Sequence, residues 1–146
     1  MKFKILFTII LFTFASLGSA DELRKAVDSK DRSEKNIVRD EFRKPYETLS
    51  FFQLEPDMTI VELSPGGGWY TEILANFIRK SGNLIAAHFS KDSDRAYFRN
   101  SRINFEKKVK ENNLYEKVRV VDLNSKLSDP SSVDAVLTFR NLHNWL

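Results

Sequence analysis

The stretch Thr59–Glu72, with the sequence TIVELSPGGGWYTE, constrains the fold of this chain more than any other. It begins with β-branched and apolar residues and reaches a breaker at Ser64-Pro65, which is typical of a short buried strand. Three consecutive glycines follow. Beyond them, apolar residues recur at the i, i+3, i+4, i+7 and i+8 spacing of a helix with one buried face: Tyr70, Ile73, Leu74, Phe77 and Ile78. The sequence therefore predicts a strand, a glycine loop and a helix in succession.

The glycine loop, Gly66–Gly68, is suited to binding a ligand through the main chain. Glycine adopts positive φ easily and has no Cβ, so a ligand can approach the backbone and the free N–H groups of the helix N-terminus. A strand before and a helix after are the context that a nucleotide-cofactor loop requires. A plain connection between strand and helix is the alternative. The spacing differs from the G-x-G-x-x-G of dinucleotide enzymes, because Ser64 stands at the first glycine position.

The same loop resembles the acidic-x-Gly-x-Gly-x-Gly motif of class I S-adenosylmethionine (SAM) dependent methyltransferases, with Glu62 as the acidic residue and Ser64 at the first glycine. Three segments are similar to a family of predicted bacterial methyltransferases with secretion signals: Val61–Glu72, Ala86–Phe89 and Leu137–Trp145. The resemblance runs from about Arg39 to the last residue. It implies SAM as the cofactor and methyl transfer to an unknown small-molecule acceptor.

The resemblance also implies where the cofactor binds. Backbone N–H groups of the glycine loop would hold its amino-acid end, and Glu62 would accept hydrogen bonds from its ammonium group. For Glu62, a carboxylate bonded to the loop's own backbone is a compatible alternative. The full expected set is Glu62, Gly66, Gly67, Gly68, Trp69, His88 and Asp122.

Two of these contacts are expected at the ends of the next strands, Leu84–Phe89 and Lys117–Leu123. Many SAM and NAD enzymes place an acidic residue for the ribose at the end of the second strand, where this chain has His88. A neutral histidine can hydrogen-bond a ribose, and a partly buried structural histidine is an equal alternative. Asp122 or Asn124 is expected to meet the adenine amino group, with a turn role for Asn124 left open.

The expected substrate residues follow a fourth strand, Val133–Phe139. His143 is the candidate general base, because an imidazole pKa of about 6.5 suits proton abstraction near neutral pH. A histidine that bonds only the backbone is the alternative. Arg140 is expected to bind a substrate carboxylate. Asn141 and Trp145 belong to the same expected site, and Trp69, Tyr70 and Trp145 either wall the pocket or pack in the core.

Strands that alternate with helical patterns predict an α/β, Rossmann-like parallel sheet with helices on both faces. About four strands are expected. N-terminal helices that begin at about Ser33 and are interrupted by Pro45 precede the strands, and an apolar plug of Phe51, Phe52 and Leu54 follows these helices. Lining of the cleft by Arg39 and Arg43 is possible, but surface salt bridges with Asp40 and Glu47 are the favoured role for these two.

The fourth strand is expected to be an exposed sheet edge. Class I methyltransferases usually have seven strands, so the chain is expected to be truncated at its C-terminus, with a partner or a missing half covering that edge.

The first 20 residues have the order of a secretory signal peptide: Lys2 and Lys4, an apolar run, and small residues before a cut after Ala20. A membrane anchor is the alternative, but the run is shorter than the roughly 20 apolar residues of a span. Cleavage would leave an exported, periplasmic or secreted protein with no stable membrane anchor. Residues 21–32 are then expected to form a mobile charged leader before a domain over 33–146.

Composition excludes several classes of site. The 146 residues contain no cysteine and two distant histidines, which excludes disulfides, thiolate nucleophiles and zinc-binding spacings. Without Lys2 and Lys4 the 23 basic residues fall to 21 against 20 acidic ones, and Lys107, Lys108 and Lys110 are expected on a solvated helix face, so nucleic acid is not an expected partner. A non-catalytic, exported Rossmann-like binding module is the alternative function. An NAD-dependent oxidoreductase is disfavoured by the loop spacing.

Overall fold

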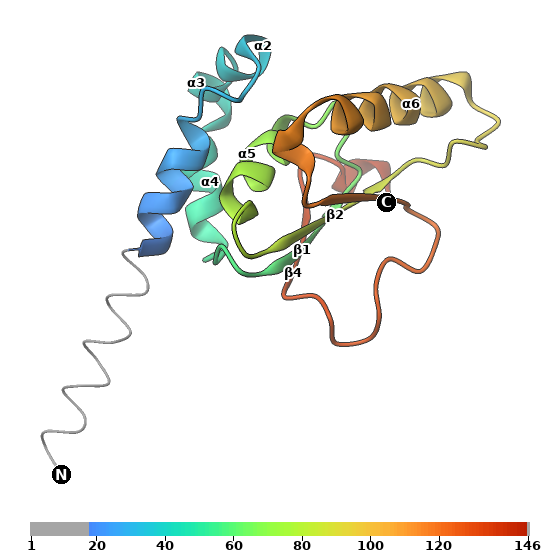
Figure 1. Ribbon diagram of the computed structural model, residues 1–146. Coiled ribbons are helices and arrows are strands. Elements are labelled where there is room, and N and C mark those ends of the chain that lie inside the picture. Colours follow the sequence, from blue (N-terminus) through green and yellow to red (C-terminus); the bar gives the residue numbers. More distant parts are fainter. Residues whose placement is uncertain (1–17, 146) are drawn as a thin grey trace, which may run out of the picture.

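A four-stranded parallel sheet forms the centre of the computed structural model, which describes residues 18–145 (Figure 1). The sheet order is β3-β2-β1-β4. Its strands are β1 (Thr59–Leu63), β2 (Asn83–His88), β3 (Val118–Asp122) and β4 (Ala135–Thr138). The predicted α/β, Rossmann-like class with N-terminal helices is confirmed.

The strand order creates a switch point beside β1. The chain moves outward from β1 to β2 and β3, and then returns to the other side of β1 with β4. In register, Leu63 of β1 lies between Ala87 of β2 and Thr138 of β4, so the carboxyl ends of these strands share one edge. Ligands of open α/β sheets bind outside the carboxyl ends at such a point.

Two helices pack on one face of the sheet, α5 (Trp69–Ile78) and α6 (Ala96–Glu111). The apolar spacing predicted for the first of them holds, since Ile73, Leu74 and Ile78 are fully buried against the strands. They join the main core with residues of three strands, Ile60, Leu84 and Leu137.

The opposite face of the sheet differs from the prediction. Its apolar residues Val61, Ile85 and Ala87 pack against side chains of the connection between β3 and β4: Leu123, Leu127 and Val133. In the part of the chain that the structure describes, this connection contains no helix. Turn-forming residues such as Asp129-Pro130 interrupt it, which explains why no helical turn forms there.

Short helices precede the sheet: α2 (Glu34–Ile37), α3 (Asp40–Arg43) and α4 (Pro45–Phe51). Pro45 occupies the first turn of α4, as its fixed φ predicts. The expected apolar plug is wrong for Phe51 and Phe52, which are 83% and 40% exposed, while Leu54 is buried.

The segment expected to be a mobile charged leader is partly helical. Residues 18–27 form a helix, and Leu23 and Ala26, three positions apart, are buried in the main core. Arg32 is also buried and makes a two-pronged ion pair with Asp40, with N–O distances of 2.6 and 2.8 Å. Residues three positions apart lie on the same face of a helix, so Leu23 and Ala26 together give this segment an apolar face that packs on the core.

The predicted signal peptide falls mainly on residues 1–17, which lie outside the described residues, and it stays a prediction. Over residues 18–145, no helix has the length and apolar character that crossing a membrane requires.

Candidate ligand-binding site

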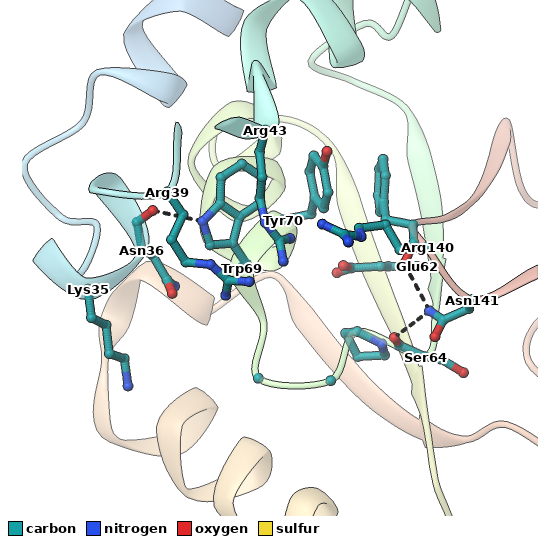
Figure 2. A pocket seen from close by; sticks show the side chains of 14 residues that line it. Lys35, Asn36, Arg39, Arg43, Glu62, Ser64, Trp69, Tyr70, Arg140 and Asn141 are labelled. Atoms are coloured by element: carbon teal, nitrogen blue, oxygen red, sulfur yellow. Dashed lines mark hydrogen bonds between the residues drawn. The ribbon is translucent and has the colours of Figure 1, made fainter. Parts of the chain in front are cut away.

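A cavity of about 470 Å³ lies at the switch point beside β1 (Figure 2). Three parts of the chain form its walls: the N-terminal helices, the glycine loop with the start of α5, and the segment after β4. The lining residues are Lys35, Asn36, Arg39, Arg43, Glu62, Ser64, Pro65, Gly66, Gly67, Trp69, Tyr70, Phe139, Arg140 and Asn141. Sequence segments more than 100 residues apart therefore meet in one site.

The loop after β1 has a left-handed backbone at three positions. The φ angles are +53° at Ser64, +58° at Gly66 and +77° at Gly68. Only glycine adopts such angles without strain. Ser64 therefore occupies, at some conformational cost, the position where the methyltransferase motif has its first glycine.

Side chains contact the carbonyl groups of all three glycines of the loop. The ring Nε2 of His88 lies 3.1 Å from the carbonyl of Gly66, and the Nζ of Lys108 lies 3.2 Å from the carbonyls of both Gly67 and Gly68. Among the described residues, the N–H groups of Gly66 and Gly67 have no hydrogen-bond acceptor. A Cβ built on either glycine would meet no atom within 4 Å, so the space on the Cβ side of both residues is open.

His88 is the buried structural histidine of the two alternatives. It is fully buried, and the N–H of Phe89 donates to its Nδ1 at 2.8 Å, so Nε2 carries the proton and donates to the carbonyl of Gly66. Burial lowers the pKa of His88, against the opposing effect of the bond to Gly66. Both ring nitrogens are occupied by the backbone, which leaves none for a ribose.

Lys108 departs from the solvated face that was expected for it. Its Nζ lies 2.8 Å from the buried carboxylate of Glu72, which also accepts from the hydroxyl of Ser33 at 2.9 Å. Burial alone would raise the pKa of Glu72, but the bond from Lys108 and its charge lower it overall. Lys108 therefore joins α6, α5 and the glycine loop, and no sequence pattern separated it from its exposed neighbours.

Glu62 is a buried carboxyl on the cavity wall. It is 2% exposed, and the hydroxyl of Thr71 donates to it at 2.6 Å. Burial raises the pKa of Glu62 to about 7, with the bond from Thr71 and the charge of Lys108 acting in the opposite direction. Its partner is a side chain of α5 rather than the loop backbone. A cationic group entering the cavity would favour the charged form.

Three arginines converge on the cavity from two walls, Arg39 and Arg43 from α3 and its N-cap, and Arg140 from the segment after β4 (Figure 2). The favoured salt bridges with Asp40 and Glu47 are wrong for Arg39 and Arg43. The arginine ion pairs of the described residues involve Arg32, Arg79 and Arg102 instead. Burial, followed by the charges of Arg39 and Arg140, lowers the pKa of Arg43.

Aromatic side chains orient this cationic wall. The guanidinium of Arg43 lies 4.7 Å from the ring centre of Trp69, whose indole N–H donates to the carbonyl of Asn36 at 2.8 Å. Tyr70 and Phe139 stack with ring centres 3.5 Å apart. Trp69 both lines the cavity and is buried in the core.

The segment after β4 is fixed to the glycine loop. Arg140 has a φ of +61°, a strained angle for a residue with a Cβ. The side-chain amide of Asn141 donates to the carbonyls of Ser64 at 3.1 Å and Phe139 at 3.2 Å. Asn141 thus serves to position the loop and Arg140 relative to each other.

Several predicted site residues do not line the cavity. His143 and Trp145 are exposed beyond it, in and after the short η2 turn (Leu142–Asn144). Gly68 is turned toward Lys108. Asp122 accepts from the N–H of Asn124 at 2.9 Å, and this bond, followed by one from Ser90, lowers the pKa of Asp122.

The sequence-based prediction set aside Arg39 and Arg43 as cavity residues, and it missed four further lining residues: Lys35, Asn36, Pro65 and Phe139. One signal was available, since Arg39 and Arg43 share a helix face in the segment that precedes the first strand. The others had no local pattern, because the cavity is assembled from distant segments.

Comparisons with known proteins match the chain to a solved structure. No family model matches the chain, and no curated protein matches it. A crystal structure of a SAM dependent methyltransferase from Aquifex aeolicus matches with a TM-score of 0.55 at 20% sequence identity. The match covers 86% of this chain and 58% of that structure, so the chain spans little more than half the length of the protein it resembles. At this identity the match shows a shared fold.

Proposed function

We propose that the chain is a SAM-dependent methyltransferase, or part of one, that acts on a small-molecule acceptor. The observation that carries the proposal is the open glycine loop at the switch point. Gly66 and Gly67 line the cavity together with the buried carboxyl of Glu62, and their N–H groups have no hydrogen-bond acceptor among the described residues. The shared fold with a SAM dependent methyltransferase supports the same assignment.

The residues of the cavity fit such a cofactor. Free N–H groups beside a helix N-terminus suit its carboxylate, and Glu62 suits its ammonium group. Burial disfavours the ionised form of Glu62 because it removes water from the carboxylate. A cation bound beside Glu62 would stabilise that ionised form again. A ribose ligand is missing from this fit, because His88 is bonded to the backbone.

When bound, SAM supplies a methyl group whose bond to the sulfonium breaks with its electrons going to sulfur, as a lone pair of the acceptor bonds the carbon. The chain's own residues hold and dehydrate the reactants. The aromatic wall of Trp69 and Tyr70 excludes water, and Asn141 keeps the segment after β4 aligned with the loop. Alignment and exclusion of water are what a reaction that removes charge needs most.

A non-catalytic binding module is the second candidate function. It is favoured by the position of His143, because the expected general base lies outside the cavity. Export by the predicted signal peptide and coverage of the β4 edge by a partner or a further part of the chain belong to both proposals.

Calorimetric titration with S-adenosylhomocysteine, SAM and NAD tests the assignment. Gly67→Asp is the decisive variant, because a side chain at this position meets no protein atom and would project into the ligand's space. We expect the wild type to bind both adenosyl ligands, and Gly67→Asp to lose this binding without a change in melting temperature. Gly67→Asn adds nearly the same volume without the charge, so comparing it with Gly67→Asp separates the two effects. Failure of the wild type to bind any of the three ligands would favour the binding module.

A further inference from the structure

The charge on the cavity wall exceeds what the proposed cofactor can match. The lining contains four cationic side chains, Lys35, Arg39, Arg43 and Arg140, against one carboxyl, Glu62. SAM itself carries two positive groups and one carboxylate, so its net charge is positive. Its carboxylate can engage at most two guanidinium groups. Cationic charge therefore remains unmatched when the cofactor is in place, and a second, anionic ligand would match it.

The three guanidinium groups are placed to hold that ligand. They converge from two walls that are far apart in sequence, with no carboxylate of the described residues within ion-pair distance of them (Figure 2). Their mutual repulsion is expressed in the lowered pKa of Arg43, for which burial is the first cause. Arg43 packs on Trp69, and the backbone beside Arg140 is fixed to the glycine loop by the bond from Asn141 to the carbonyl of Ser64. Planar guanidinium groups bind carboxylate and phosphate oxygens in pairs, which gives both strength and orientation.

Aromatic rings complete the same wall. Tyr70 and Phe139 stack on each other and line the cavity beside Arg140. Their faces suit the apolar body of a ligand whose charged end meets the arginines.

We infer that the methyl acceptor, on the proposed methyltransferase function, is an oxyanion-bearing molecule whose carboxylate or phosphate group is held by Arg39, Arg43 and Arg140. The oxyanion serves as the group by which the acceptor is recognised. It occupies the cavity together with the cofactor, so the two ligands bind at the same time.

The test is a titration of the full chain with phenyl phosphate, benzoate and neutral benzyl alcohol, each with and without saturating S-adenosylhomocysteine. The three probes share a phenyl ring, and the two anions distinguish a phosphate from a carboxylate. We expect at least one anion to bind, benzyl alcohol to bind at least about tenfold more weakly, and binding to persist with S-adenosylhomocysteine present. Raising the salt concentration should weaken binding of the anion more than binding of benzyl alcohol.

Variants locate the site. Arg43→Gln and Arg140→Gln should each lower the affinity for the anion at least about tenfold, and Arg43→Lys should lower it less. Arg79→Gln is the matched control, because Arg79 pairs with Asp31 on the surface and does not line the cavity. Melting temperatures show whether each variant is folded.

The outcomes separate the two proposals. Binding of S-adenosylhomocysteine with no anion binding would overturn the inference alone, as would equal binding of benzyl alcohol or unchanged affinity in both glutamine variants. Strict competition between the anion and S-adenosylhomocysteine would also overturn it, because the arginines would then serve the cofactor's carboxylate. Anion binding without adenosyl binding would overturn the proposed function and the acceptor assignment with it.

Discussion

Glu62 is a carboxyl that the fold both buries and aims at a cavity. Its pKa of about 7 arises from burial, while the one described bond to it, from Thr71, favours the charged form. Such a group is held near its titration point until a ligand supplies a positive charge. This behaviour is what the acidic position of the loop motif requires if it is to respond to the ammonium group of a cofactor.

Glu62 predicts a pH dependence of stability. Because its pKa is raised in the folded state, the folded protein binds more protons than the unfolded chain between about pH 4.5 and 7, and stability falls as pH rises through this range. Relative to Glu62→Gln, the wild type should lose about 2.5 kcal/mol of unfolding free energy between about pH 5 and 8. Urea titrations of both proteins measure it, and the difference cancels other groups such as His88. A flat difference would contradict the burial of Glu62.

Substitution by alanine should destabilise the protein at Gly68 but have little effect at the adjacent Gly67. A Cβ at Gly67 meets open space, whereas at Gly68 it would lie 2.9 Å from the ring of Phe105, at a φ of +77°. Gly68→Ala should cost at least about 1–2 kcal/mol of unfolding free energy, and Gly67→Ala should change it by less than about 0.5 kcal/mol. Denaturant titration of the two variants compares them directly. Equal losses would mean that the loop is not in the conformation described.

At the scale of elements, α6 stabilises the glycine loop from behind. Lys108 contacts the carbonyls of Gly67 and Gly68 and the carboxylate of Glu72, and so ties the sheet-facing helices to the loop. The carbonyl groups of the loop are bound in this way, while the N–H groups of Gly66 and Gly67 have no acceptor among the described residues. The loop's capacity to bind an anionic group therefore depends on a lysine 40 residues away in sequence.

Replacing Lys108 tests this dependence. Lys108→Met leaves Glu72 buried without its cation, so it should cost about 3 kcal/mol of unfolding free energy and weaken S-adenosylhomocysteine binding. Adding Glu72→Gln should restore part of the stability. Lys107→Met is the matched control, because Lys107 is exposed and, among residues 18–145, forms an ion pair with Glu111 alone; its effect should stay within about 0.5 kcal/mol. Similar losses for the two lysines would contradict the role of Lys108.

At the scale of the whole molecule, the cavity's charge predicts which adenosyl ligand binds better. S-adenosylhomocysteine lacks the sulfonium charge of SAM, and the cavity lining is predominantly cationic. It should therefore bind more tightly than SAM at low ionic strength, and the difference should shrink as salt is added, because screening shortens from about 10 Å at 0.1 M to about 3 Å at 1 M. Arg140→Gln should also reduce the difference in affinity between S-adenosylhomocysteine and SAM. Calorimetry across a salt series measures this ratio, and tighter binding of SAM at low salt would contradict it.

The arrangement of the molecule explains which of the predicted site residues line the cavity. Glu62, Gly66, Gly67 and Trp69 lie within one continuous stretch, so their spacing already defined a strand, a turn and a helix start. Arg140 and Asn141 line the cavity because parallel pairing brings the end of β4 beside β1. His143, a few residues beyond, is exposed, since the η2 turn leads the chain away from the cavity.

The sequence by itself determined the β1, glycine loop and α5 unit, the parallel α/β class and the restart of a helix at Pro45. These follow from local periodicity and from the conformational limits of glycine and proline, which act within a few residues. Only the tertiary structure decided that His88 and Lys108 support the loop, that Glu62 is dehydrated, and that three arginines share one cavity. Those properties depend on burial and on charges from distant segments, and both are set by how the elements pack rather than by neighbours in the chain.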